Sequence, residues 1–220
     1  MANTLTTSRT AGVLARLFAA AEAQEAAAQD DSPPLRPWQD LTAAERADAR
    51  QEAYMPVSPE GGQLLYALAR AARPQTVVEF GTSFGISTIF LAAAVTDNGT
   101  GQVFSTELSA VKIRTAGENL HEAGVDRPVT VLAGDARETL ADVPGPIGLV
   151  LLDGWKELYL PVLRLLEPRL APGALVVADD SSFASVADYL TYVRDPAHGY
   201  VTVSFPVGDG MEVSSWTGDN

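Results

Sequence analysis

The residues best suited to chemistry lie where two apolar segments of the sequence end. The run "LLDGWK" brings Asp153, Trp155 and Lys156 to the end of the first segment. The run "ALVVADD" brings Asp179 and Asp180 to the end of the second. If both segments are strands of one sheet, three carboxylates and a lysine share an edge. Carboxylates that meet in this way repel one another unless a cation or hydrogen-bond donors offset their charge.

Three earlier apolar runs also end in residues suited to a ligand. "TVVEFGTSFG" carries Glu79 at its end and then Gly81, which lets the backbone turn tightly into a helix. "FSTEL" ends in Glu107, where a carboxylate can accept both hydroxyls of a ribose. "VLAGDA" contains Asp135, which could accept from an adenine amine or cap the next helix. Each acid alone is also explained as a helix cap, a turn residue or an exposed strand end. The functional interpretation therefore depends on all of these acids occurring together.

Strand-like runs alternate with segments of helical periodicity, which predicts a parallel sheet covered on both faces. The strand-like runs are 76–80, 101–107, 129–134, 147–153 and 173–180, and the helical segments are 85–96, 109–123, 135–141 and 155–168. Ligands bind beyond the carboxyl ends of the strands in such folds. The tail 199–216 holds two strand-like runs separated by "PVGDG", which predicts a hairpin with one antiparallel strand.

The N-terminal quarter differs from this βα pattern. Residues 1–57 are predicted to form a helical lid or accessory segment before a domain over 58–220. Helical spacing over 10–29 predicts one helix, which prolines end. Thr42 with Glu45 three residues later is a capping box that predicts a second helix.

Composition limits the classes of partner. The 220 residues include 28 acidic and 15 basic side chains, a formal charge of −13, with no basic run to follow a phosphate backbone. We therefore expect neither nucleic acid nor an anionic membrane as a partner. The chain has no cysteine, which fits a cytoplasmic location. The N-terminal apolar stretch is interrupted by Arg16 and followed by Glu22 and Glu25, as in an amphipathic helix.

These segments together resemble the class I S-adenosylmethionine-dependent methyltransferases, and among them the cation-dependent catechol and caffeoyl-CoA O-methyltransferases. The resemblance covers residues 55–213. "VVEFGTSFGIST" is similar to the family's cofactor loop, "FSTEL" to its ribose-binding segment, and "LLDGWKELYLPVLRLLEPRLAPGALVVADD" to its cation-binding segment. The resemblance implies a Rossmann-like α/β methyltransferase fold, with a seven-stranded, mostly parallel sheet, an antiparallel C-terminal hairpin strand and helices on both faces.

The resemblance also implies roles for individual residues. Asp153, Asp179 and Asp180 would hold a magnesium-like divalent cation, and Lys156 would take the proton from an attacking hydroxyl, with Asp153 also counted as catalytic. The cofactor residues that it implies are Val57, Ser58, Glu79, Gly81, Ser83, Ser87, Glu107, Leu108, Asp135, Ala136, Asp153 and Trp155. The family usually has asparagine in place of Asp180, so this site carries one more negative charge.

The implied reaction is methyl transfer to a hydroxyl of a small aromatic or vicinally hydroxylated acceptor. The aromatic side chains available to a planar acceptor are Trp38, Tyr54, Trp155 and Tyr159. Val203 falls near the position where the catechol enzyme of animals carries an acid for the second hydroxyl, so catechol itself is not implied. A homodimer is one arrangement open to such a domain.

Three alternatives remain open. "GTSFG" also satisfies G-x-S-x-G, the nucleophile elbow of α/β-hydrolases, and Ser83, Asp179 or Asp180, and His198 follow the hydrolase order. An elbow needs several strands upstream, whereas only helices are predicted before this motif. The unusual Asp180 motivates the other two alternatives, a metal-independent methyltransferase and a non-catalytic cofactor-binding module.

Overall fold

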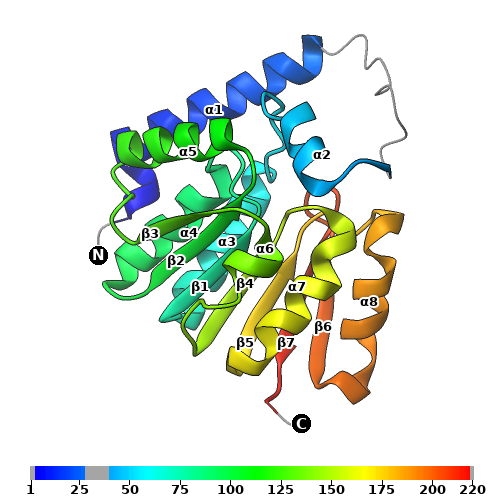
Figure 1. Cartoon of the computed structure of the whole chain (residues 1–220). Helices are drawn as coiled ribbons and strands as arrows, with labels where there is room; N and C mark the ends of the chain where they lie inside the picture. Colours follow the sequence, from blue (N-terminus) through cyan, green and yellow to red (C-terminus); the bar gives the residue numbers. More distant parts are fainter. Residues whose placement is uncertain (1–2, 28–39, 219–220) are drawn as a thin grey trace.

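The computed structural model describes residues 3–27 and 40–218 as an α/β fold around one sheet (Figure 1). The seven strands lie in the order β3-β2-β1-β4-β5-β7-β6. They are β1 (Thr76–Phe80), β2 (Gln102–Glu107), β3 (Val129–Ala133), β4 (Ile147–Leu152), β5 (Leu170–Ala178), β6 (Tyr200–Phe205) and β7 (Met211–Trp216). β1 to β5 pair in parallel, and β7 is antiparallel to both β5 and β6. The predicted fold class is therefore confirmed.

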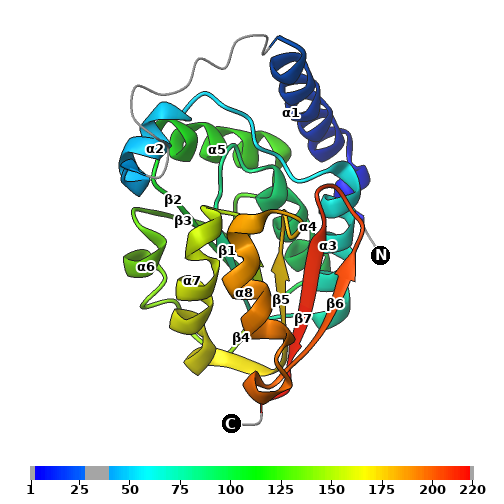
Figure 2. The same ribbon diagram turned by 90° about the vertical axis from the view of Figure 1, so that its right-hand side faces the viewer.

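Helices cover both faces of the sheet, as the view towards its β6 side shows (Figure 2). The helices are α1 (Ser8–Ala27), α2 (Ala43–Ala49), α3 (Pro59–Ala72), α4 (Ile86–Asn98), α5 (Ala110–Ala123), α6 (Ala136–Thr139), α7 (Tyr159–Leu166) and α8 (Ala187–Arg194). One apolar core joins α1, α3, α4 and α5 to one face of the sheet. A second core joins α6, α7 and α8 to the other face. The central strands β1 and β4 are buried between these cores, which accounts for their nearly continuous apolar sequences.

Local sequence signals account for where most helices begin. Thr42 and Glu45 form the predicted capping box of α2, and the Ser58 hydroxyl accepts from the Gly61 amide at the start of α3. The helix predicted over 155–168 is divided into the 3₁₀ turn η3 (Lys156–Leu158), α7 and the 3₁₀ turn η4 (Glu167–Arg169). Helix α8 was not predicted, because its eight residues show little periodicity on their own.

The N-terminal residues are tied to the sheet domain by buried apolar contacts and by hydrogen bonds. Val13 and Leu17 of α1 are buried in the core shared with α4 and α5. Asp97 at the end of α4 accepts from the Thr4 hydroxyl at 2.6 Å and from the Tyr66 hydroxyl at 2.6 Å. Within the described ranges, no helix is long and apolar enough to cross a membrane. The division at residue 57 stays a prediction, and these contacts suggest a way to test it.

We predict that Leu17→Ala lowers the free energy of unfolding by about 2 to 5 kcal/mol, the usual cost of removing a buried leucine side chain. Leu17 is 0% exposed. Urea denaturation followed by circular dichroism measures the effect, and Val201→Ala, at a site that is 68% exposed, is the control. If Leu17→Ala lowers the free energy of unfolding no more than Val201→Ala does, α1 behaves as a separate lid.

Candidate active site

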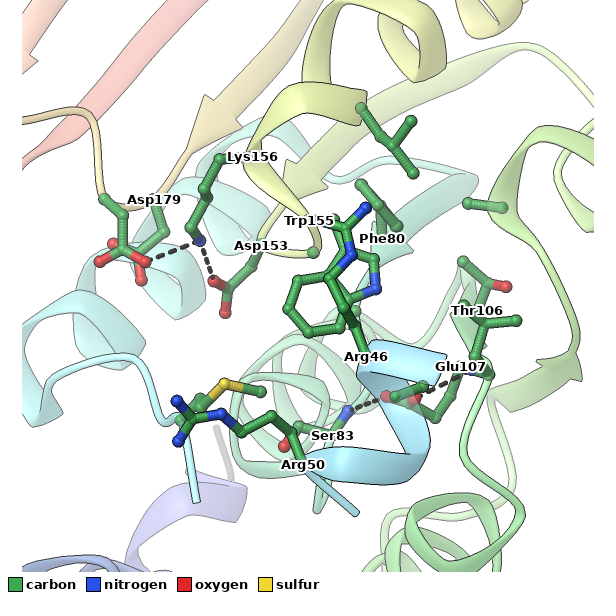
Figure 3. Close-up of a pocket in the computed structure, with 18 of the residues that line it drawn as sticks. Arg46, Arg50, Phe80, Ser83, Thr106, Glu107, Asp153, Trp155, Lys156 and Asp179 are labelled. Atoms are coloured by element: carbon green, nitrogen blue, oxygen red, sulfur yellow. Dashed lines mark hydrogen bonds and ion pairs between the residues drawn. The ribbon is translucent and has the colours of Figure 1, made fainter. Parts of the chain in front are cut away.

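The carboxyl ends of the parallel strands open into one cavity of about 510 Å³ (Figure 3). The sheet order reverses between β1 and β4, and ligands bind at such a point in open α/β sheets. Eleven of the predicted site residues line this cavity: Gly81, Ser83, Glu107, Leu108, Asp135, Ala136, Asp153, Trp155, Lys156, Asp179 and Asp180. Val57 and Ser87 line a smaller adjoining cavity, and Ser58 lines a third.

Glu107 is held at the end of β2 by backbone donors. Its Oε2 atom accepts from the Ser83 amide at 2.9 Å, and its Oε1 atom accepts from the Leu108 and Ser109 amides, each at 2.9 Å. These bonds hold the carboxylate in one orientation between the β1 loop and α5. A carboxylate fixed in this way, with its outer lone pairs towards the cavity, can accept from a pair of ligand hydroxyls.

Gly81 brings the β1 loop close to the loop that follows β4. Its φ is +107°, a conformation that favours glycine, and a Cβ atom there would lie 2.5 Å from the Asp153 carbonyl oxygen. The close approach places the loop that begins after Phe80 directly beside Asp153. A ligand lying along this loop would therefore reach the acidic end of the cavity.

Glu79 lies beneath this loop rather than in the cavity wall. The side chain is 0% exposed, and its Oε2 atom accepts from the Thr88 and Ser105 hydroxyls. Burial raises the pKa of Glu79 to about 7, although these hydroxyls act in the opposite direction. The direct cofactor contact expected of Glu79 is therefore corrected to a supporting position that ties β1 to α4 and β2.

Asp135 caps a helix, as one of its two predicted roles requires, and it also lines the cavity. Its side chain accepts from the Arg137 amide at 2.9 Å as the cap of α6, and it also forms an ion pair with the Arg137 guanidinium at 2.6 Å. The same residue lines the cavity with Ala136. The cap fixes the carboxylate at the edge of the cavity beside Glu107.

The three predicted aspartates meet at the other end of the cavity. Asp153, Asp179 and Asp180 each offer a carboxylate oxygen, and these oxygens all lie within 4.8 Å of one another. Burial and mutual repulsion raise the pKa of Asp153 and of Asp179. Asp180 has a φ of +56°, a left-handed conformation that aspartate and asparagine tolerate better than most residues. The fold thus concentrates negative charge at one point.

Lys156 lies within this cluster. Its Nζ atom is 2.6 Å from Asp180 and 3.4 Å from Asp153, and it donates to the Tyr159 hydroxyl at 2.8 Å. Burial lowers the pKa of Lys156, but the aspartates outweigh burial and hold its pKa above the ordinary value. Tyr159 is 0% exposed, so it positions the lysine and does not face an acceptor, contrary to expectation.

Several charged residues of the cavity wall were not predicted, among them Arg46, Arg50, Lys112 and Asp209. Arg46 lies over Trp155, with its Cζ atom 5.1 Å from the ring centroid, and pairs with Glu157. Arg46 and Arg50 are four residues apart, a spacing that would have placed both on one side of the predicted helix. Asp209 lies in the turn between β6 and β7. The sequence predicted this turn but did not indicate that it reaches the cavity.

The hydrolase alternative is not supported by the geometry. Ser83 lies at the carboxyl end of β1, in the cavity. His198 precedes β6, which runs parallel to β5, so it lies at the opposite end of the strands. Its ring stacks on Tyr192 with centroids 3.9 Å apart. No serine–histidine pair can form across that separation.

Two expectations about the acceptor end also change. Val203 is 51% exposed on β6 and lines none of the three described cavities, because the hairpin strand carries it away from the strand ends. Asp209 of the hairpin turn lines two of these cavities together with Asp179 and Asp180 instead. Trp38 lies outside the described residues, whereas Tyr54 and Trp155 line described cavities as expected.

Comparison with known proteins agrees with this arrangement. A family described as a methyltransferase domain matches residues 78–181. Catechol O-methyltransferase of Niastella koreensis is 31% identical over 136 residues, which cover 59% of this chain and 61% of that protein. The mouse catechol O-methyltransferase is 27% identical over 173 residues, covering 76% and 64% respectively. Residues 78–181 therefore match a methyltransferase domain, and the chain is similar to proteins named catechol O-methyltransferase. It spans just over three fifths of the length of these curated relatives.

Solved structures show the same methyltransferase fold. Cofactor-bound Rv0187 from MTB is 25% identical, with a TM-score of 0.68 and coverage of 90% of this chain and 96% of that one. The O-methyltransferase TomG from Streptomyces achromogenes, in complex with SAM, is 21% identical with a TM-score of 0.65, covering 90% and 96%. The second similarity concerns the fold alone.

We predict that the buried Glu79 makes stability fall as pH rises from about 4 to about 7. The folded state keeps the Glu79 proton up to about pH 7, whereas an unfolded glutamate loses it near pH 4.3, so unfolding releases a proton in this window. Glu79→Gln should reduce this pH-dependent loss in the free energy of unfolding by roughly 3 kcal/mol. Urea unfolding at pH 5 and pH 7.5 measures it. The exposed Glu118→Gln is the control, and an unchanged pH dependence in Glu79→Gln would contradict the prediction.

Proposed function

We propose that this protein transfers a methyl group from S-adenosylmethionine to a hydroxyl of a small acceptor, with the help of a divalent cation. The observation that carries the proposal is a single cavity that joins Glu107 and the Gly81 loop at one end to three aspartates and Lys156 at the other. The activities named for the relatives support this reaction class. The acceptor is proposed to be aromatic or vicinally hydroxylated.

The donor set fits a hard divalent cation. Asp153, Asp179 and Asp180 offer three carboxylate oxygens within 4.8 Å, without nitrogen or sulfur ligands. Lys156 balances only part of their charge, since burial and repulsion still raise the pKa of Asp153 and of Asp179. Magnesium is the cation that we propose. When bound, it would lower the pKa of an acceptor hydroxyl and orient that hydroxyl.

The residues of the chain divide the remaining work between them. In this proposal Glu107 accepts from the ribose hydroxyls of S-adenosylmethionine, whose sulfonium supplies an activated methyl group. The Gly81 loop would hold the methionine portion next to Asp153. Lys156 is the amine that lies at the acidic end, and once its carboxylate partners are engaged elsewhere its Nζ atom can accept the hydroxyl proton. Holding both reactants in one cavity supplies orientation.

Glu107→Ala should weaken S-adenosylmethionine binding by about 1 to 3 kcal/mol, because ribose hydroxyls would be left without their acceptor. Isothermal titration calorimetry measures the change. Glu118→Ala on the exposed side of α5 is the matched control, and circular dichroism checks that both variants fold. Equal affinity in a folded Glu107→Ala protein would contradict the assignment of the ribose site.

The catalytic proposal is tested by methyl transfer to a panel of vicinally hydroxylated aromatics. EDTA should abolish turnover, and Lys156→Met should lower it by about 10² to 10⁴ with cofactor affinity nearly intact, as for loss of a general base. The exposed Asp142→Asn variant should behave as the parent protein.

The outcomes separate the remaining alternatives. Turnover that survives both EDTA and Asp179→Ala would identify a metal-independent methyltransferase. Cofactor binding without turnover on any acceptor would identify a non-catalytic module.

A further inference from the structure

We propose that the methyl acceptor is an anion, and that Arg50 binds its carboxylate at the end of the cavity that also holds the aspartates. This inference rests on the methyl transfer proposed above and narrows its substrate class to hydroxylated acids. It concerns a residue of the N-terminal part of the chain, outside the segments that resemble the family.

Arg50 lies where two cavities meet. The main cavity and a second one of about 590 Å³ share six lining residues: Arg50, Met55, Pro56, Asp179, Asp180 and Asp209. Arg50 is the cation among these six. A small molecule whose hydroxyl lies at Asp179 and Asp180 would therefore extend along a space that Arg50 also borders.

The helix that carries Arg50 is anchored to the site. Arg46, one turn earlier, lies over Trp155 and pairs with Glu157, so α2 is fastened to the loop after β4. Arg50 is the C-cap residue of this helix. In Figure 3 the Arg46 side chain reaches Trp155, whereas the Arg50 side chain extends towards the end of the cavity that holds Asp153 and Asp179. Arg46 thus positions the helix, and Arg50 is directed to the acceptor end.

The charge of the site indicates why a guanidinium is needed there. The protein has a formal charge of −13, and Asp209 adds a fourth carboxylate to the lining of the acceptor end. An anionic acceptor would be repelled by these groups unless a cation faced it. A guanidinium presents a planar fork of donors that matches a carboxylate in two parallel hydrogen bonds.

Apolar side chains in the wall of the same cavity suit the body of such an acceptor. Met55 is 48% exposed and Phe183 is 45% exposed, and both line the main cavity. They offer contact surface to an aromatic ring that has its hydroxyls at the aspartates and its acid at Arg50. A hydroxylated benzoate has this arrangement of groups.

The carboxylate of S-adenosylmethionine is the competing ligand for Arg50. The resemblance places the methionine end of the cofactor at Val57 and Ser58, and its carboxylate beside Ser87. Ser87 lines the small cavity beside the Gly81 loop, and Arg50 does not, although Arg50 shares the third cavity with Val57 and Ser58. The acceptor carboxylate is the ligand that we propose for Arg50, and cofactor affinity distinguishes the two ligands.

The test compares 3,4-dihydroxybenzoate with its neutral analogue 3,4-dihydroxybenzamide. Calorimetry on the protein loaded with S-adenosylhomocysteine and magnesium measures binding without turnover. The acid should bind at least about tenfold more tightly than the amide, as expected for a charge-assisted pair. Arg50→Gln should remove this preference, Arg50→Lys should keep part of it, and the exposed Arg114→Gln should keep all of it.

Two results would overturn the inference. One is the absence of any preference for the acid in the parent protein, including a failure of the acid to bind. The other is an Arg50→Gln protein that keeps the preference but binds S-adenosylmethionine at least about tenfold more weakly, which would assign Arg50 to the cofactor. Methyl transfer to either compound is measured separately. Transfer without a preference for the acid would leave the proposed function intact and remove only the anionic acceptor.

Discussion

The repulsion among Asp153, Asp179 and Asp180 is the constraint on which the rest of the site depends. The ends of two buried strands bring three carboxylates within 4.8 Å, where little water remains to stabilise their charge. Lys156 supplies one positive charge, and Tyr159 holds that lysine in place. Charge of this kind is costly to bury without compensation. A divalent cation is the compensation that we propose, because it fits the oxygen donors.

The two ends of the cavity handle negative charge in different ways. Glu107 is surrounded by three backbone donors, so its carboxylate is satisfied before any ligand arrives. The aspartates are satisfied only in part. Gly81 joins the two ends, because its missing side chain lets the β1 loop lie against the Asp153 backbone. One rigid contact therefore sets the spacing between a preorganised binding end and an incompletely compensated acidic end.

The elements outside the parallel sheet supply what the strand ends lack. α2 contributes Arg46 and brings Arg50 to the cavity, and the β6–β7 turn contributes Asp209. These groups lie around the aspartates, whereas the opposite end of the cavity is built from β1, β2 and the loops after them. In the function that we propose, acceptor choice can therefore change through α2 and the hairpin turn without disturbing the strands that carry the proposed cofactor residues.

The sequence by itself determined the sheet, most of its helices and the residues at the strand ends. Alternating apolar and helical periods require a covered parallel sheet, and this topology brings Asp153 and Asp179 to one edge. The eight residues of α8 were too few to show a period. Tertiary structure alone decided that Glu79 faces inward, that Tyr159 supports Lys156, and that His198 lies far from Ser83. It also decided that Arg50 and Asp209 reach the cavity. Local pattern specifies where a strand ends, but which distant side chains meet there depends on packing between elements that are remote in the chain.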